Sequence, residues 1–267
     1  MKILTLATST VKGLLHNRLL VLVLLLAVCV ILIMMAPLYA FRQQLTPENR
    51  QGMESMLLEI LSQLMGFVSG LGSLLAAWCA ADAVSTELKS GTVLAVMARP
   101  VKRWEFLLGK YLGVMLFMTA YIAVVMGISY LLAAVGGQHL HAAPWILFVY
   151  PLVRYGIYAA LAMFFATMVH AVMAMAAVFV ISIVTTMVEP QSMEWTRKLM
   201  WLKTALYYVL PSTSLLTESR FLSLRQASIK QASWIEHLLS LGYGLDCAVV
   251  LFCLAAWSFH YRSLRQE

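Results

Sequence analysis

LLVLVLLLAVCVILIMMAPLYAF, residues 19–41, decides the fold class because it contains no charged side chain. The hydrocarbon core of a bilayer is about 30 Å thick, and a helix needs roughly 20 apolar residues to cross it. Open strands cannot cross, because their backbone groups would lack hydrogen-bond partners in lipid. The stretch follows Arg18 and is longer than the apolar part of a secretory signal peptide, so we expect a retained transmembrane helix.

Five further blocks along the chain are long and apolar enough to cross a bilayer. The chain is 62% hydrophobic and only 12% charged, where soluble domains carry roughly 25% charged residues. The pattern predicts one all-α integral membrane domain over residues 1–267, with six transmembrane helices. A weaker stretch, 199–216, contains Lys203 and Pro211 and fits an interfacial segment better. The five further blocks are residues 60–81, 111–135, 145–168, 171–188 and 238–259.

Basic residues indicate the orientation, because short loops rich in Lys and Arg stay in the cytoplasm. Residues 1–18 mix leucines with basic side chains and suit a helix lying along the inner interface. The external connection 189–237 weakens the argument because it is also basic, but long connections obey the rule less strictly. We expect both termini inside. The basic residues then on the inner side are Lys2, Lys12, Arg18, Lys89, Arg99, Lys102, Arg103, Lys110, Arg262 and Arg265.

The most informative connection joins the second and third spans and reads DAVSTELKSGTVLAVMARPVKRWEFLLGK, residues 82–110. Its pattern predicts a short helix over 83–90 that ends at Gly91. A second short helix over 93–98 would end at Pro100, and residues 102–105 would open the third span. An apolar segment with a basic rim is typical of a docking site. A helix resting on lipid is the alternative.

This connection resembles the corresponding loop of ABC type-2 permeases, the membrane subunits of ATP-binding-cassette transporters. The resemblance implies a cytoplasmic coupling helix within 82–110, seated in a separate ATPase subunit. It also implies that two permease chains pair, as a homodimer or a heterodimer, above two ATPases that close around ATP. The residues expected to couple to the ATPase are Glu87, Gly91, Thr92, Leu94, Met97, Arg99, Pro100 and Arg103, and Gly109-Lys110 completes the resemblance.

The chain itself lacks the phosphate-binding motif Gly-x-x-x-x-Gly-Lys-Ser/Thr, so we expect no ATP hydrolysis, catalytic residue or cofactor in it. ATP and Mg would be bound by the partner. His139 and His141 share a loop but lack a third ligand, so we expect no metal site. The net charge of +7 fits attraction to membrane lipid, with no nucleic-acid motif present. The resemblance implies a bacterial inner-membrane protein that drives export or mechanical work, with an external or periplasmic partner possible at 189–237.

Two ionisable residues, Arg154 and Asp246, fall inside expected spans. Such groups are costly in lipid and are often functional. Three roles stay open: they line a translocation path, they pair with each other, or they snorkel to the interface. Small residues at helical spacing, Gly66 with Gly70 and Gly109 with Gly113, predict close helix packing within one subunit, with a dimer face as the alternative.

Two other classes of function compete with a permease subunit. A self-contained secondary transporter commonly shows internal repeats and broken helices, which this sequence lacks. An intramembrane aspartyl enzyme needs two carboxylates that share a proton. Gly242, Gly244 and Asp246 resemble part of such a site, but no second acid lies inside an expected span.

Overall fold

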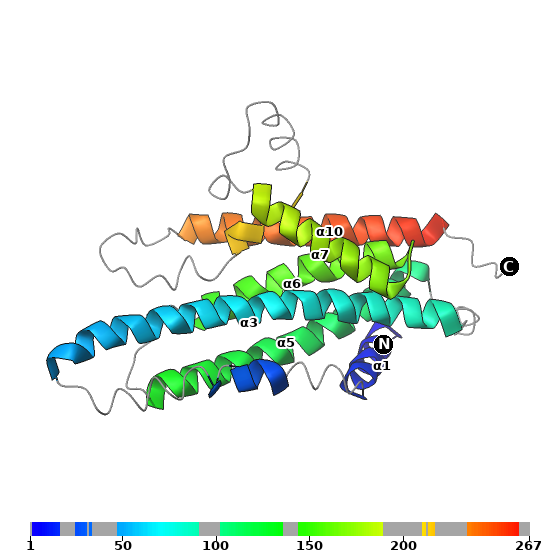
Figure 1. Ribbon diagram of the computed structural model, residues 1–267. Coiled ribbons are helices and arrows are strands. Elements are labelled where there is room, and N and C mark those ends of the chain that lie inside the picture. The colour runs from blue at the N-terminus through cyan, green and yellow to red at the C-terminus, as the bar shows by residue number, and fades with distance from the viewer. Residues whose placement is uncertain are drawn as a thin grey trace.

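The protein is a bundle of long helices in the computed structural model (Figure 1). The structure describes residues 2–16, 25–30, 32–33, 47–90, 102–135, 144–188, 210–211, 213–216 and 234–261, and these contain no strand. The helices are α1 (Lys2–His16), α3 (Pro47–Ser90), α5 (Arg103–Val135), α6 (Pro144–Ala166), α7 (Ala171–Val188) and α10 (Trp234–Tyr261), with a short 3₁₀ helix, η2 (Thr213–Leu216).

Four of these helices are long and apolar enough to cross a membrane: Gly66–Glu87 within α3, Arg103–Leu131 within α5, Leu147–Ala166 within α6, and all of α10. α7 begins and ends where the sequence predicts, with an apolar stretch over Ala171–Thr185. The first expected span, 19–41, lies mostly outside the described residues, although 25–30 and 32–33 are helical. The all-α membrane class is confirmed, and the count of six spans stays a prediction.

α6 is the central helix and contacts α3, α5, α7, η2 and α10. Every side chain from Val153 to Met163 is buried. The facing stretch of α3 is rich in alanine, and Ala76, Ala77, Ala80 and Ala81 are fully buried. Small side chains let helix backbones approach closely, which is a main source of packing energy where lipid surrounds the bundle.

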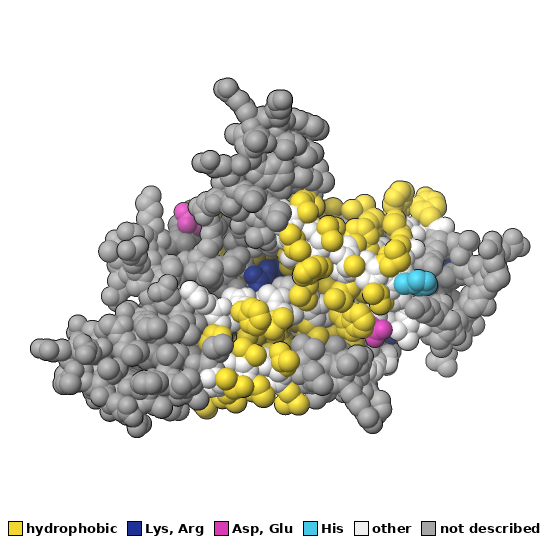
Figure 2. Space-filling model, in the orientation of Figure 1, with side chains coloured by type: hydrophobic (Ala, Val, Ile, Leu, Met, Phe, Trp, Pro, Cys, Tyr) yellow, Lys and Arg dark blue, Asp and Glu magenta, His cyan; other side chains and the backbone are white. Residues whose placement is uncertain are grey.

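The outside of the bundle is apolar, as expected of a lipid-facing surface. On α10, a stripe formed by Gly244, Ala248, Ala255 and Phe259 is buried, while large apolar side chains between them are exposed. Figure 2 shows hydrophobic side chains over much of the described surface on one face, with sparse charged groups. The exposed side chains of α10 include Leu238, Leu245, Val249, Val250, Leu254 and Trp257.

Hydroxyl groups within the helices donate to carbonyl oxygens one turn earlier in the same helix. Such bonds satisfy a polar side chain without a partner from another helix, which suits a surrounding without water. They occur on α3, α5 and α7. The pairs are Ser73 to Ser69 at 3.2 Å, Ser85 to Ala81 at 2.6 Å, Thr119 to Met115 at 2.8 Å, Ser129 to Val125 at 2.9 Å and Thr185 to Ile181 at 2.7 Å.

α3 is one continuous helix where the sequence predicts a separate short helix after the second span. The sequence predicts a separate short helix over 83–90, but α3 runs without a break from Pro47 to Ser90. Asp82 does not interrupt it, because the Thr86 hydroxyl donates to the Asp82 carboxylate at 3.0 Å within the same helix. The helix does end one residue before Gly91, as predicted. At about 1.5 Å per residue, its 44 residues extend roughly 66 Å, more than twice the hydrocarbon thickness.

The end of the stretch 199–216 also differs from a simple interfacial segment. η2 contacts α6, α7 and α10, and Leu216 is fully buried. A Cβ added at Gly244 would lie 2.6 Å from Val153 Cγ1 and 2.9 Å from Leu216 Cδ1. The missing side chain at Gly244 leaves the space that Leu216 occupies, so this part of the stretch lies within the bundle.

Glycine positions show where helices come closest. A Cβ at Gly113 on α5 would lie 2.7 Å from Thr10 Cβ and 2.8 Å from the Ala7 carbonyl oxygen on α1. The prediction of close packing within one subunit is therefore right at Gly113. At Gly66 and Gly70 a Cβ would have no described atom within 4 Å, so the prediction stays untested there.

Candidate functional site

One end of the bundle gathers the parts of the chain that the sequence analysis places inside the cell. α1, the last turn of α3, the first turn of α5 and the last turn of α10 lie together at this end (Figure 1). Residues 91–101, which connect α3 to α5, therefore join the bundle on the same side as both termini. We call this side the inner end.

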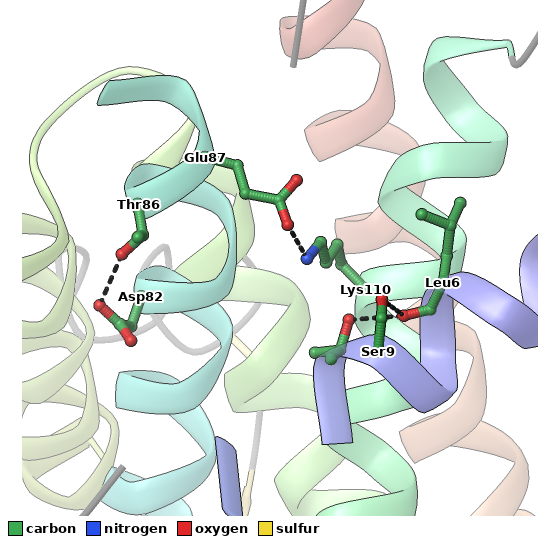
Figure 3. A network of polar contacts seen from close by, with 7 residues as sticks. Leu6, Ser9, Asp82, Thr86, Glu87 and Lys110 are labelled. Atoms are coloured by element: carbon green, nitrogen blue, oxygen red, sulfur yellow. Dashed lines mark hydrogen bonds and ion pairs between the residues drawn. The ribbon is translucent and has the colours of Figure 1, made fainter. Parts of the chain in front are cut away.

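An ion pair joins α3 and α5 at the inner end. Lys110 Nζ contacts Glu87 Oε1, and the Lys110 side chain is 6% exposed against 26% for Glu87. Figure 3 shows Lys110 reaching from α5 toward Glu87 on α3, beside the first helix. The pair spans the two ends of the connection 91–101. It joins the last turns of α3 to the start of α5.

α5 begins with a local capping interaction. The backbone N–H of Lys102 donates to Glu105 Oε2 at 3.1 Å, and an acid three residues into a helix commonly satisfies a free amide in this way. The sequence correctly predicts that residues 102–105 open this helix.

Arg103 contacts the C-terminal end of α10. Its Nη1 donates to the carbonyl oxygen of His260 at 2.8 Å and to that of Phe259 at 3.3 Å. Carbonyls in the last turn of a helix lack partners within the helix, and a cation is favourable there because of the helix dipole. In this structure the Arg103 side chain therefore binds to α10 of the same chain.

The remaining expected coupling residues are not placed. Gly91, Thr92, Leu94, Met97, Arg99 and Pro100 lie outside the described residues, as does the predicted short helix over 93–98. Glu87 and Arg103, which are described, each contact a neighbouring helix of the bundle. Both residues are thereby placed at the base of the connection, and an ATPase contact at 91–101 stays a prediction.

Phe106 was missed as a member of this site, and Lys110 was named only as part of the resemblance, although both lie on the same face of α5 as Arg103. The Phe106 ring stacks on that of Phe259, with centroids 6.0 Å apart, and Lys110 Nζ lies 5.7 Å from the centroid of the Phe106 ring. The spacing of 103, 106 and 110 follows a helical period of three and four residues. That spacing was the available signal.

Arg154 and Asp246 do not come together. Arg154 Nη2 donates to Ser69 Oγ on α3, and the Arg154 side chain is buried. Asp246 lies on the exposed face of α10, and no ion pair joins the two among the described residues. Arg154 lies twelve residues before the end of α6, roughly 18 Å along the helix, and is therefore near the middle of α6.

Two tyrosines extend the polar cluster around Arg154. The Tyr155 hydroxyl donates to Ser69 Oγ at 3.4 Å, and the Tyr121 hydroxyl donates to the Val68 carbonyl at 3.0 Å. A Cβ at Gly72 would lie 2.6 Å from Tyr155 Cζ and 2.8 Å from Tyr121 Cε1. Gly72 is thus the glycine of α3 that permits close packing, and it supports a polar contact between α3, α5 and α6.

The comparison with protein families decides the class. The family model described as ABC-2 family transporter protein matches residues 12–264, almost the whole chain. The chain belongs to this family. No curated protein matches the sequence.

Membership of the ABC-2 transporter family confirms the resemblance drawn from residues 87–110 and makes the chain a multi-pass membrane permease of an ABC transporter. A permease of this family implies a partner ATPase. The inner end is then the candidate site where this permease meets that partner, because it carries the connection with the family pattern.

Proposed function

We propose that this chain is the membrane-spanning subunit that couples ATP hydrolysis by a separate ATPase to export or to mechanical work across the membrane. The single observation that carries the proposal is the position of the connection 91–101. It leaves and re-enters the bundle through two long helices, α3 and α5, which the Glu87–Lys110 pair joins at its base. A force applied to this connection acts on two spans at once.

The ATP and Mg of the reaction belong to the partner, because the sequence has no phosphate-binding loop of its own. We place the inner end in the cytoplasm of a bacterial cell, at the inner membrane. The concentration of basic residues in 1–18 and 89–110 supports this side. A second permease chain, identical or related, completes the transporter, and the segment expected outside, 189–237, is where an external partner would bind.

Co-purification tests the partnership. The chain is co-expressed with the ATPase encoded in the neighbouring reading frame, solubilised in mild detergent and purified through a tag on the permease. We expect the ATPase in stoichiometric amount, and we expect Arg99→Glu or Gly91→Pro to remove it. Lys102→Gln is a control for charge loss near the connection. An ATPase that stays bound to both Arg99→Glu and Gly91→Pro would show that 91–101 is not the coupling segment.

We also propose a translocation role for Arg154, the buried cation between α3 and α6. Burying a charge inside a membrane bundle costs free energy, and residues that carry such a charge are often functional. Asp246 is the second candidate, and it would act from the exposed face of α10. Arg154→Leu and Asp246→Asn are assayed for transport or for the phenotype of the intact system. Full activity in both variants would exclude them as translocation residues.

A further inference from the structure

The first two turns of α5 present three contact residues on one face: Arg103, Phe106 and Lys110. Residues separated by three and four positions lie above one another on a helix. Lys110 contacts Glu87 on α3, whereas Arg103 and Phe106 contact the end of α10. This face of α5 therefore joins the helix before the connection 91–101 to the last span of the protein.

The contact with α10 has a polar and an apolar part. Arg103 holds the carbonyl oxygens of Phe259 and His260. Phe106 and Phe259 are both fully buried, and their rings stack with an interplanar angle of 20°. A cation at a helix C-terminus and a pair of stacked aromatic rings are both favourable contacts, so both hold the first turns of α5 to the end of α10.

α10 is also held at its opposite end. The ring of Trp234 stacks on that of Trp145 on α6, with centroids 5.5 Å apart and an interplanar angle of 9°. His237 is buried beside them and shares a hydrogen bond of 2.7 Å with the Tyr150 hydroxyl of α6. The outer end of α10 is therefore fastened to α6. Its inner end contacts α5 through Arg103 and Phe106, and the Ser258 hydroxyl shares one hydrogen bond of 2.9 Å with Thr167, which follows α6.

We infer that Arg103 is a positioning residue that transmits movement of the connection 91–101 to α10. The inner end of α10 follows α5, while its outer end stays attached to α6 through Trp234 and His237. α10 thereby tilts about its outer end, next to the external segment 189–233. The inference rests on the proposed function, because the partner ATPase supplies the movement.

Distance measurements between spin labels test the transmission in the permease–ATPase complex in lipid nanodiscs. The native cysteines are replaced, and labels are placed at exposed positions. One pair, Val172→Cys on α7 with Leu116→Cys on α5, follows α5. A second pair, Val172→Cys with Leu254→Cys on α10, follows α10. Each pair is measured without nucleotide and with ATP trapped by vanadate.

We expect both distances to shift with nucleotide in the otherwise unchanged protein. In Arg103→Gln, the α5 shift is retained and the α10 shift is lost. Arg103→Lys restores part of it, because an ammonium group still donates to the carbonyls. Lys102→Gln, which removes the adjacent exposed charge, behaves as the unchanged protein. Phe106→Leu keeps an apolar side chain but loses the ring stack, and it also reduces the α10 shift. This variant tests the transmission if Arg103→Gln does not fold.

Two results would contradict the account, and they are distinguishable. An α10 shift of unchanged size in both Arg103→Gln and Phe106→Leu overturns the transmission and leaves the proposed function intact. The absence of any nucleotide-dependent shift in the unchanged complex overturns the proposed function, and the transmission with it.

Discussion

At the scale of single residues, the ionisable groups inside the bundle have partners on distant parts of the chain. Lys110 pairs with Glu87, and Arg154 contacts Ser69. The sequence predicts that Arg154 is buried in a span, because the surrounding block is apolar. It does not predict the partner, because Ser69 is a small polar residue in another span and nothing local connects the two.

Glu87→Gln is expected to destabilise the protein. The substitution leaves the Lys110 ammonium buried with a neutral partner, and loss of a charged hydrogen bond costs roughly 1.5–3 kcal/mol. Thermal unfolding of the purified protein in nanodiscs measures the loss. Asp82→Asn is the matched control, because it removes a carboxylate from the same helix that accepts a hydrogen bond from Thr86, one turn away. Equal melting temperatures for the two variants would mean that the pair contributes nothing.

Ser69→Ala tests the polar cluster at Arg154. Removing the hydroxyl takes away an acceptor for the Arg154 guanidinium and for the Tyr155 hydroxyl, and we expect a loss of about 1–3 kcal/mol. Ser73→Ala is the control, because this serine is buried on the same helix and donates only to its own backbone. Thermal unfolding of the purified protein in nanodiscs again measures the loss. If Ser73→Ala is as costly as Ser69→Ala, the guanidinium contact is not the source of the effect.

At the scale of helices, the sequence predicts several boundaries correctly. α7 spans 171–188, α3 ends before Gly91, and α5 opens at residues 102–105. These succeed because hydrophobic length, glycine and capping residues act locally. The burial of Leu216 is missed, because it depends on Gly244, a residue of another helix. The continuity of α3 through Asp82 is also missed, although Thr86, which contacts the carboxylate, lies only one turn away.

Gly113→Ala is expected to loosen α1 from α5. Its methyl group would overlap the Ala7 carbonyl and Thr10, and overpacking of this kind costs about 1–3 kcal/mol. Hydrogen exchange of residues 2–16 reports the loosening. Gly127→Ala on the same helix is the control, since no described atom lies near its added methyl, and it should be neutral or stabilising by up to about 1 kcal/mol. Unchanged exchange of α1 in Gly113→Ala would show that the helix does not depend on this contact.

At the scale of the whole molecule, the proposed function depends most on which segments lie at each end of the helix bundle. Both termini and the connection 91–101 adjoin one end of the bundle, and the Trp145–Trp234 contact lies at the other. The sequence predicts this arrangement from hydrophobic length and from basic residues. At the inner end, Arg103 and Phe106 contact α10. These contacts join residues more than 150 positions apart in the sequence, so only the structure shows them.

The central claim is tested most directly by measuring on which side of the membrane the connection 91–101 lies. In a variant without the native cysteines, Thr92→Cys is treated with a membrane-impermeant maleimide, first in intact cells and then in inverted membrane vesicles. His139→Cys, in the connection between α5 and α6, provides the opposite control. We predict that Thr92→Cys reacts only in the vesicles and that His139→Cys reacts in intact cells. Reaction of Thr92→Cys in intact cells would place the connection outside, beyond the reach of any cytoplasmic ATPase.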